Sequence, residues 1–262
     1  MPAETSASRI AAAVARRFGA ALDVPAGLQH LDALAALNER SVCRCYRRDP
    51  VPEALVRLLC ASALAAPTKS DLQQATLVRV ADSGKRAAIC ALLPGSPWLA
   101  QAPELFVFCA DGLRLRRLFA RRGVEFPNEH LDAFFNATVD AALALGAFVS
   151  AAELAGLGTC PISQIRDHVS KIDELLSLPD WVVPVAGLAL GYPEAKEPMS
   201  VRLSLSATVH TDRYDTGAVE RELDAYDARR WKDWSGDKVK QYSRVMRADF
   251  GAYVGRKRFR LG

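Results

Sequence analysis

The longest apolar stretch of this chain, residues 138–155, constrains its fold more than any other feature. It is rich in Ala and Leu, and its only charged residues are Asp140 and Glu153. A helix that is apolar nearly all round has no side suited to water, so we expect it to lie in a large core or at a subunit interface. Gly156 follows at the place where a left-handed helix end favours a residue without Cβ. Residues 159–162 then form a short apolar strand candidate.

Helices and strands alternate along the rest of the chain without the spacing of regular βαβ units. The predicted strands are 76–80, 105–109, 159–162 and 182–190. The predicted helices are 6–22, 28–38, 53–65, 85–93, 138–155 and 169–178, with further helical parts from 219 onward. Residues 111–130 are expected to be an exposed, partly helical excursion, and 194–215 to be polar and extended. This pattern favours an α+β fold with a mixed sheet flanked by helices around a buried central helix.

Regularly spaced aromatic residues mark the charged C-terminal segment, so we expect it to be held against another surface, such as a second subunit. These residues are Trp231, Trp234, Tyr242, Phe250, Tyr253 and Phe259.

The composition is that of an ordinary globular protein and sets only broad limits. The 262 residues suffice for one large domain or two small ones, and 50% of them are hydrophobic. The net charge of +4 suits a small anionic ligand but is too weak to argue for nucleic acid. Nucleic-acid binding is therefore the weakest of the functions considered.

The cysteines and the ends of the chain favour a cytoplasmic protein. Three of the six cysteines lie in apolar runs, where Cys acts as a small hydrophobe, and the pair Cys43 and Cys45 lacks the second ligand pair of a structural zinc site. We therefore expect reduced thiols. No apolar run is judged long enough to span a bilayer, so no membrane association is predicted. The amphipathic, Arg-containing N-terminus could be a transit peptide, but a surface helix is favoured.

The common catalytic and nucleotide-binding motifs are missing from the sequence. The pair Gly156 and Gly158 follows a helix and precedes a strand, the reverse of the order in a dinucleotide-binding turn. There is no Walker loop and no G-x-S-x-G elbow, and the four histidines lie far apart in sequence, so no metal site is predicted.

Three cationic or hydroxyl-bearing segments remain as candidates to converge on one phosphate-bearing planar ligand. They are Arg40, Ser41 and Arg44; Thr68, Lys69 and Ser70; and Arg202, which is flanked by Ser200 and Ser204. The arginine fork matches two phosphate oxygens at once, which makes Arg the preferred residue for such a ligand. Each segment alone is more often plain surface, because exposed Lys and Arg are the norm.

Taken in order, short motifs along the chain resemble the FMN-dependent nitroreductase family, especially its NADPH-preferring branch that reduces nitrofurans and quinones. The motifs include Arg44-x-Tyr46, Ala66-Pro67-Thr68-x-Ser70-x-Leu72-Gln73, Ala102-Pro103-x-x-Phe106, Gly156-Leu-Gly158-Thr-Cys160, Ile162-x-x-Ile-Arg166, Leu178-Pro179, Gly187-Leu-x-Leu-Gly-Tyr-Pro193, Arg202-Leu203 and Val209-His210. No single motif is diagnostic, but their order is specific at the level of the family.

This resemblance implies a nitroreductase-like fold, an intertwined homodimer and FMN held at the dimer interface. Family members oxidise NAD(P)H and then reduce a nitroaromatic or quinone acceptor at the same flavin face, in a ping-pong cycle. Residues 1–39 would be an N-terminal helical extension. Residues 40–262 would form the nitroreductase-like domain, with a C-terminal extension from about residue 194.

The resemblance also implies which residues bind the cofactor, and none of them is expected to be a catalytic nucleophile. Arg40, Ser41 and Arg44 fall on the N-terminal flavin segment; Thr68, Lys69 and Ser70 fall on a second loop; Arg202 falls on a phosphate-binding cation. Pro161, Ile162, Ser163 and Gln164 fall on the turn whose backbone N–H faces the reactive flavin nitrogen. Where the family usually has Gly-Gly in this turn, this chain has Ser163-Gln164.

Two other readings of the same motifs stay open. The flavin could serve another reaction, such as dehydrogenation, dehalogenation or flavin breakdown. The chain could also be an FMN-binding protein without turnover.

Overall fold

The computed structural model describes residues 4–230 and 250–259, and the chain divides into two compact units. Unit 1 consists of Met1–Ser41 with Lys196–Val245, and unit 2 of Val42–Ala195 with Met246–Gly262. In the described residues, unit 1 is built from helices, whereas unit 2 contains the sheet. The aromatic residues Trp231, Trp234 and Tyr242 lie outside the described residues.

A four-stranded sheet forms the centre of unit 2. Its strands are β1 Ala75–Arg79, β2 Glu104–Asp111, β3 Gly158–Ile162 and β4 Val182–Gly191. They lie in the order β1-β2-β4-β3, and every neighbouring pair is antiparallel. The α+β class is thus confirmed, but the pairing in the described residues is antiparallel throughout and not mixed. The two central strands are those with the longest apolar runs, as expected for strands covered on both faces.

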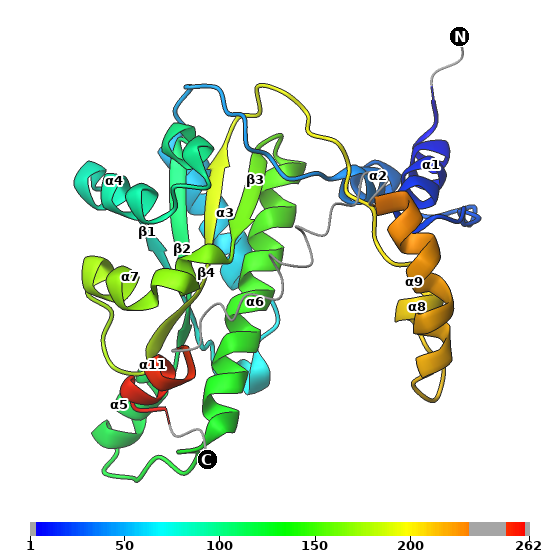
Figure 1. The fold of residues 1–262 in the computed structure, drawn as a ribbon. Helices are drawn as coiled ribbons and strands as arrows, with labels where there is room; N and C mark the ends of the chain where they lie inside the picture. The colour runs from blue at the N-terminus through cyan, green and yellow to red at the C-terminus, as the bar shows by residue number, and fades with distance from the viewer. Residues whose placement is uncertain (1–3, 231–249, 260–262) are drawn as a thin grey trace. The chain divides into compact units, whose positions relative to one another are not determined.

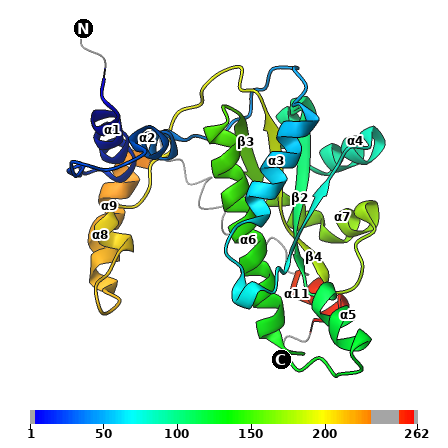
Figure 2. The ribbon, with the colours of Figure 1, turned by 180° about the vertical axis from the view of Figure 1, so that it is seen from behind.

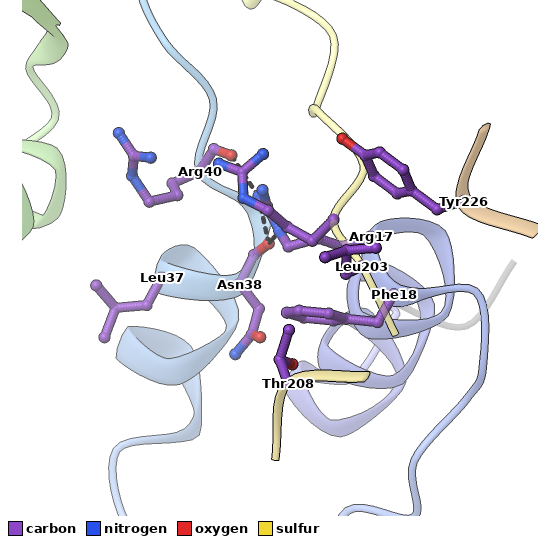
Figure 3. A pocket seen from close by; sticks show the side chains of 9 residues that line it. Arg17, Phe18, Leu37, Asn38, Arg40, Leu203, Thr208 and Tyr226 are labelled. Atoms are coloured by element: carbon purple, nitrogen blue, oxygen red, sulfur yellow. Dashed lines mark hydrogen bonds between the residues drawn. The ribbon is translucent and has the colours of Figure 1, made fainter. Parts of the chain in front are cut away.

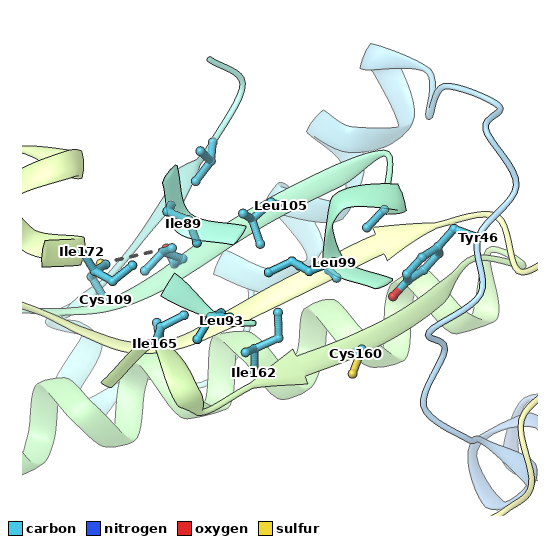
Figure 4. Packing of buried hydrophobic residues seen from close by; sticks show 14 of the residues in the cluster. Tyr46, Ile89, Leu93, Leu99, Leu105, Cys109, Cys160, Ile162, Ile165 and Ile172 are labelled. Carbon is cyan, nitrogen blue, oxygen red and sulfur yellow. Dashed lines mark hydrogen bonds between the residues drawn. The ribbon is translucent and has the colours of Figure 1, made fainter. Parts of the chain in front are cut away.

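Helices cover both faces of this sheet (Figures 1 and 2). On one face, α3 Glu53–Leu64 and α6 Leu131–Leu154 pack on side chains of β2 and β4, with Phe148 of α6 in contact with Phe106 and Phe108. On the other face lie α4 Ser83–Leu92, the 3₁₀ turn η2 Pro97–Gln101 and α7 Val169–Leu176. Figure 4 shows that second apolar cluster, with Tyr46 near Cys160 of β3.

The central helix α6 is long and apolar, as predicted, but one of its faces is exposed. Among the residues on that face are five that we call the α6 stripe: Leu131, Phe135, Val139, Leu143 and Leu154. Within the described residues, α6 is also the one helix long and apolar enough to cross a membrane by length and composition. The prediction that no run reaches this length was therefore wrong. Core helices of globular proteins pass the same test, and α6 packs on the sheet and on α3.

Two segments of unit 2 are more ordered than the sequence indicated. Within the predicted excursion 111–130, residues Leu113–Arg121 form α5, and its Arg116 is only 8% exposed. This cation pairs with Glu129 at 2.6 Å and lies over the ring of Phe126. Near the C-terminus, α11 Phe250–Arg256 belongs to the same unit. Tyr253 and Phe259 are buried there in an apolar cluster that includes Ala133 of α6 and Val183 of β4. The described part of the aromatic segment is therefore held by its own chain.

Unit 1 is helical where it is described. Its helices are α1 Ser6–Phe18, α2 Leu31–Glu39, the short α8 Leu205–Thr208 and α9 Thr216–Arg230. The side chain of Thr5 caps α1, and Arg9 of α1 forms an ion pair with Glu39 of α2 at 2.6 Å. The region 194–215 is mostly without regular structure, as predicted, except for the single turn of α8.

Candidate functional site

The predicted cation Arg44 lies in segment 42–46, which unit 2 holds firmly in place. The N–H of Cys43 donates to the carbonyl of Thr159 at 2.8 Å, and the hydroxyl of Tyr46 donates to the carbonyl of Cys43 at 2.6 Å. Burial raises the pKa of this tyrosine, so it stays a neutral donor. A Cβ on Gly158 would lie 2.6 Å from Cys43, so only glycine allows this close approach of the segment to β3. The exposed Arg44 thus projects from a fixed main chain.

Arg40 and Arg202, which are far apart in sequence, line one cavity of unit 1. Its volume is about 580 Å³, within the range of ligand sites. It is lined by Arg17, Phe18, Leu37, Asn38, Arg40, Arg202, Leu203, Thr208 and Tyr226 (Figure 3). The side chain of Arg202 is exposed, and its Nη1 donates to the Ser200 hydroxyl at 2.6 Å. Ser41 is half-buried and does not line this cavity.

A third arginine of this cavity, Arg17, holds the main chain that bears the other two. It is only 7% exposed, and its guanidinium donates to three carbonyl oxygens: Asn38 at 3.0 Å, Arg40 at 2.6 Å and Ser200 at 3.1 Å. Its own carbonyl accepts the N–H of Arg202 at 2.7 Å. Figure 3 shows Arg17 in the middle of the group, with its hydrogen bonds to Asn38 and Arg40 drawn as dashed lines. Arg17 therefore fixes the walls of the cavity.

The second predicted segment, Thr68 to Ser70, belongs to a loop of unit 2 that follows α3. The hydroxyl of Thr68 donates to Asp140 of α6 at 2.5 Å, and Lys69 Nζ lies 3.3 Å from Asp132. Both partners of the Lys69–Asp132 pair are about half exposed, where an ion pair contributes little to stability. Ser70 is exposed and has a left-handed backbone with φ of 49°. The three predicted residues are thus together in one loop, although Thr68 is turned toward α6.

The third predicted segment lies at the end of β3 and in the 3₁₀ turn η3 Gln164–His168. Pro161 and Ser163 are exposed, whereas Ile162 is buried in the sheet core. The side chain of Gln164 accepts a hydrogen bond from the hydroxyl of Ser96 at 3.2 Å. Two of the four residues thus present an exposed surface, and Ile162 supports the turn from below.

Sequence reasoning missed the buried charged residues that support these segments. Arg17 and Asp140 are among the least exposed charged residues described, yet both donate to or accept from the main chain of predicted site segments. The sequence offered no signal for Arg17, because a cation at the end of a surface helix is normally exposed. The only signal for Asp140 was its place as a lone carboxylate inside an apolar helix.

Comparison with known proteins gives a consistent family. Residues 37–192 match the model of the nitroreductase family. An FMN reductase [NAD(P)H] of Bacillus subtilis is 31% identical over 206 residues, which cover 75% of this chain and 80% of that protein. An oxygen-insensitive NADPH nitroreductase of Salmonella typhimurium is 33% identical over 180 residues, covering 68% and 72%.

Solved structures agree with the sequence matches. The structure of NfrA2 from B. megaterium has a TM-score of 0.83 at 26% identity and covers 88% of this chain and 99% of that one. The resemblance of the ordered motifs is thereby confirmed: this chain belongs to the nitroreductase family.

Proposed function

We propose that this protein is an FMN-dependent NAD(P)H oxidoreductase that reduces small acceptors of the nitroaromatic or quinone class. Family membership supports this activity, as do relatives named FMN reductase and NADPH nitroreductase. The observation that carries the proposal is the cavity of unit 1, because it brings Arg40 and Arg202 together.

The residues of this cavity fit the phosphate-bearing tail of FMN. Two guanidinium groups can bind phosphate oxygens in bidentate fashion, and Phe18 and Tyr226 add aromatic surface. In unit 2, we assign flavin contacts to Arg44, to Lys69 and Ser70, and to the turn of Pro161, Ser163 and Gln164. Ile162 and Thr68 stay in the proposed set as residues that support these contacts.

Bound FMN would supply the two-electron chemistry, and the protein would supply binding, orientation and charge. Arg40 and Arg202 would neutralise the phosphate. Arg44 would place a positive charge near the ligand and favour an anionic ring, since charge complementarity strengthens when water is excluded. A backbone N–H of Ser163 or Gln164 would hold the ring edge by a hydrogen bond.

We further propose that two copies of the chain form a homodimer through the α6 stripe. Five large apolar side chains along one helix are unusual on the surface of a monomer, and such a patch typically marks an interaction site. A two-fold axis would bring the same stripe of a second copy against it.

Two other expectations also remain proposals. We place the protein in the cytoplasm because Cys60, Cys90 and Cys109 lie in apolar runs, where reduced cysteine acts as a small hydrophobe. The boundary of the nitroreductase-like domain is proposed near residue 40, close to the first residue of the family match.

The absorption spectrum of the purified protein tests the cofactor, and acceptor-stimulated NADPH oxidation tests the activity. We expect a yellow protein that NADPH bleaches and that menadione or nitrofurazone reoxidises with steady turnover. A yellow protein that neither NADPH nor NADH bleaches would favour an FMN-binding protein without turnover. A protein that stays colourless with excess FMN would contradict the proposal.

A further inference from the structure

The loop of residues 68–74 has an unusual backbone conformation. Ser70, Asp71 and Gln73 have φ values of 49°, 56° and 53°, in the left-handed region that residues with a Cβ rarely adopt. Such residues persist only where surrounding contacts fix them, and they gather at ligand-binding sites. Three of them within four positions therefore require a strong external restraint.

Asp140 of α6 supplies one restraint from below the loop. Its side chain is almost wholly buried, with the residue 3% exposed. One carboxylate oxygen accepts the Thr68 hydroxyl at 2.5 Å and the N–H of Gln74 at 2.9 Å, and the other accepts the N–H of Lys69 at 3.1 Å. Hydrogen bonds to an ionised acceptor are about twice as strong as neutral ones. Asp140 thus holds both ends of the loop.

Thr68 extends this restraint into the loop. Its hydroxyl, which donates to Asp140, also accepts the N–H of Gln73 at 2.8 Å. Both polar functions of the hydroxyl are therefore used within the protein. Thr68 therefore acts on the loop backbone.

Arg114 of α5 binds backbone carbonyl groups where the loop runs into β1. Its Nη2 donates to the carbonyls of Gln73 and Ala75, the latter at 2.5 Å. Asp111 lies 3.7 Å from the same nitrogen and helps to orient the guanidinium. An anion thus binds the N–H groups of the loop, and a cation binds its carbonyls.

We propose that Asp140 is a positioning residue for the cofactor site: with Thr68 and Arg114 it holds the 68–74 loop in the left-handed conformation that presents Lys69 and Ser70 to FMN. This inference rests on the proposed function only for the identity of the ligand. The restraint itself is a property of the protein without ligand. Its loss should therefore be visible both in cofactor affinity and in the free protein.

The first test compares Asp140→Asn with Asp132→Asn, a matched change on the same helix that touches only side chains of Asn128, Lys69 and Asn136. Flavin fluorescence quenching gives the dissociation constant of FMN, and hydrogen exchange of the free protein reports the Lys69 and Gln74 amides. We expect Asp140→Asn to weaken FMN binding by about 10-fold or more, the effect of losing one hydrogen bond to a charged group. Both amides should exchange faster, whereas Asp132→Asn, which meets the loop only through the side chain of Lys69, should leave the exchange of both amides near the wild-type values.

A second pair of variants keeps the inference testable if Asp140→Asn fails to fold. Thr68→Val removes the hydroxyl with little change of shape, and Thr68→Ser retains it. We expect faster exchange of the Gln73 amide in the free Thr68→Val protein and rescue by Thr68→Ser. Weaker FMN binding with unchanged exchange would instead make Thr68 a direct ligand and overturn its assignment to the restraint.

The outcomes separate this inference from the proposed function. If the wild-type protein binds no FMN, the function is wrong, and the exchange data still decide whether Asp140 restrains the loop. If the wild-type protein binds FMN and Asp140→Asn binds it equally tightly with unchanged loop exchange, the inference is wrong while the function stands.

Discussion

Replacing Phe135 by Asp should dissociate the proposed dimer. Phe135 is the second residue of the α6 stripe and is 62% exposed. A phenylalanine side chain offers roughly 200 Å² of surface, so about 125 Å² would be exposed in one copy. At about 25 cal/mol per Å², its complete burial contributes about 3 kcal/mol. A two-fold dimer buries Phe135 of both copies. The loss of binding free energy on substitution is therefore at most about 6 kcal/mol, which raises the dissociation constant about 10⁴-fold.

Sedimentation velocity over a wide range of protein concentrations measures this effect. Wild-type protein should remain dimeric on dilution, whereas Phe135→Asp should sediment as a monomer with its helical circular dichroism retained. Val124→Asp is the matched control, because Val124 is also more than half exposed but follows α5 and lies outside the stripe. Equal dissociation constants for wild type and Phe135→Asp would refute the role of the stripe, and a monomeric wild type would refute the dimer itself.

Three further predictions concern single side chains. The Arg202→Ala protein should lose FMN during gel filtration, whereas the wild-type protein retains it, because one bidentate phosphate contact is removed. Equal flavin content in the two proteins would contradict this. Arg17→Met should lower the free energy of unfolding of unit 1 by about 3 kcal/mol or more in urea titrations, since three carbonyls lose a charged donor at about 1–3 kcal/mol each; a change close to zero would refute it. Burial raises the pKa of Cys109 to about 12, so the unfolded state loses this proton near pH 9 while the folded state keeps it. Stability should therefore fall between pH 9 and 12, by about 1.4 kcal/mol per pH unit for this group, and less steeply in Cys109→Ala; parallel pH profiles would argue against it.

The sequence predicted best those elements whose apolar pattern agrees with their final surroundings. The run 105–109 became β2, and the run 138–155 became most of α6, because both are buried by neighbours on the sheet. Around α5 it predicted a partly helical excursion but missed the buried side of the helix, because residues 113–122 contain five arginines. Charge alone suggested exposure there, but Arg116 is covered by aromatic rings and neutralised by Glu129.

The candidate site was predictable to the level of segments but not of roles. The ordered motifs selected residues that the structure brings together, namely Thr68, Lys69 and Ser70 in one loop and Arg40 and Arg202 in one cavity of unit 1. The direction of each side chain depends on partners far away in sequence. The hydroxyl of Thr68, for example, binds Asp140, which lies 72 positions later in the sequence.

Two buried charged residues of this protein, Arg17 and Asp140, share one task, which is to bind backbone groups. Arg17 holds three carbonyls beside the cavity of unit 1, and Asp140 holds two amides of the 68–74 loop. Arg114, although half exposed, holds one carbonyl at the end of this loop and one at the start of β1. An unpaired backbone group in the interior is costly, so a buried ion with several such partners fixes a segment better than apolar packing does. The exposed cations can then meet an anionic ligand from positions that are already set. Mutations at the buried ions should therefore change cofactor affinity without touching the cofactor.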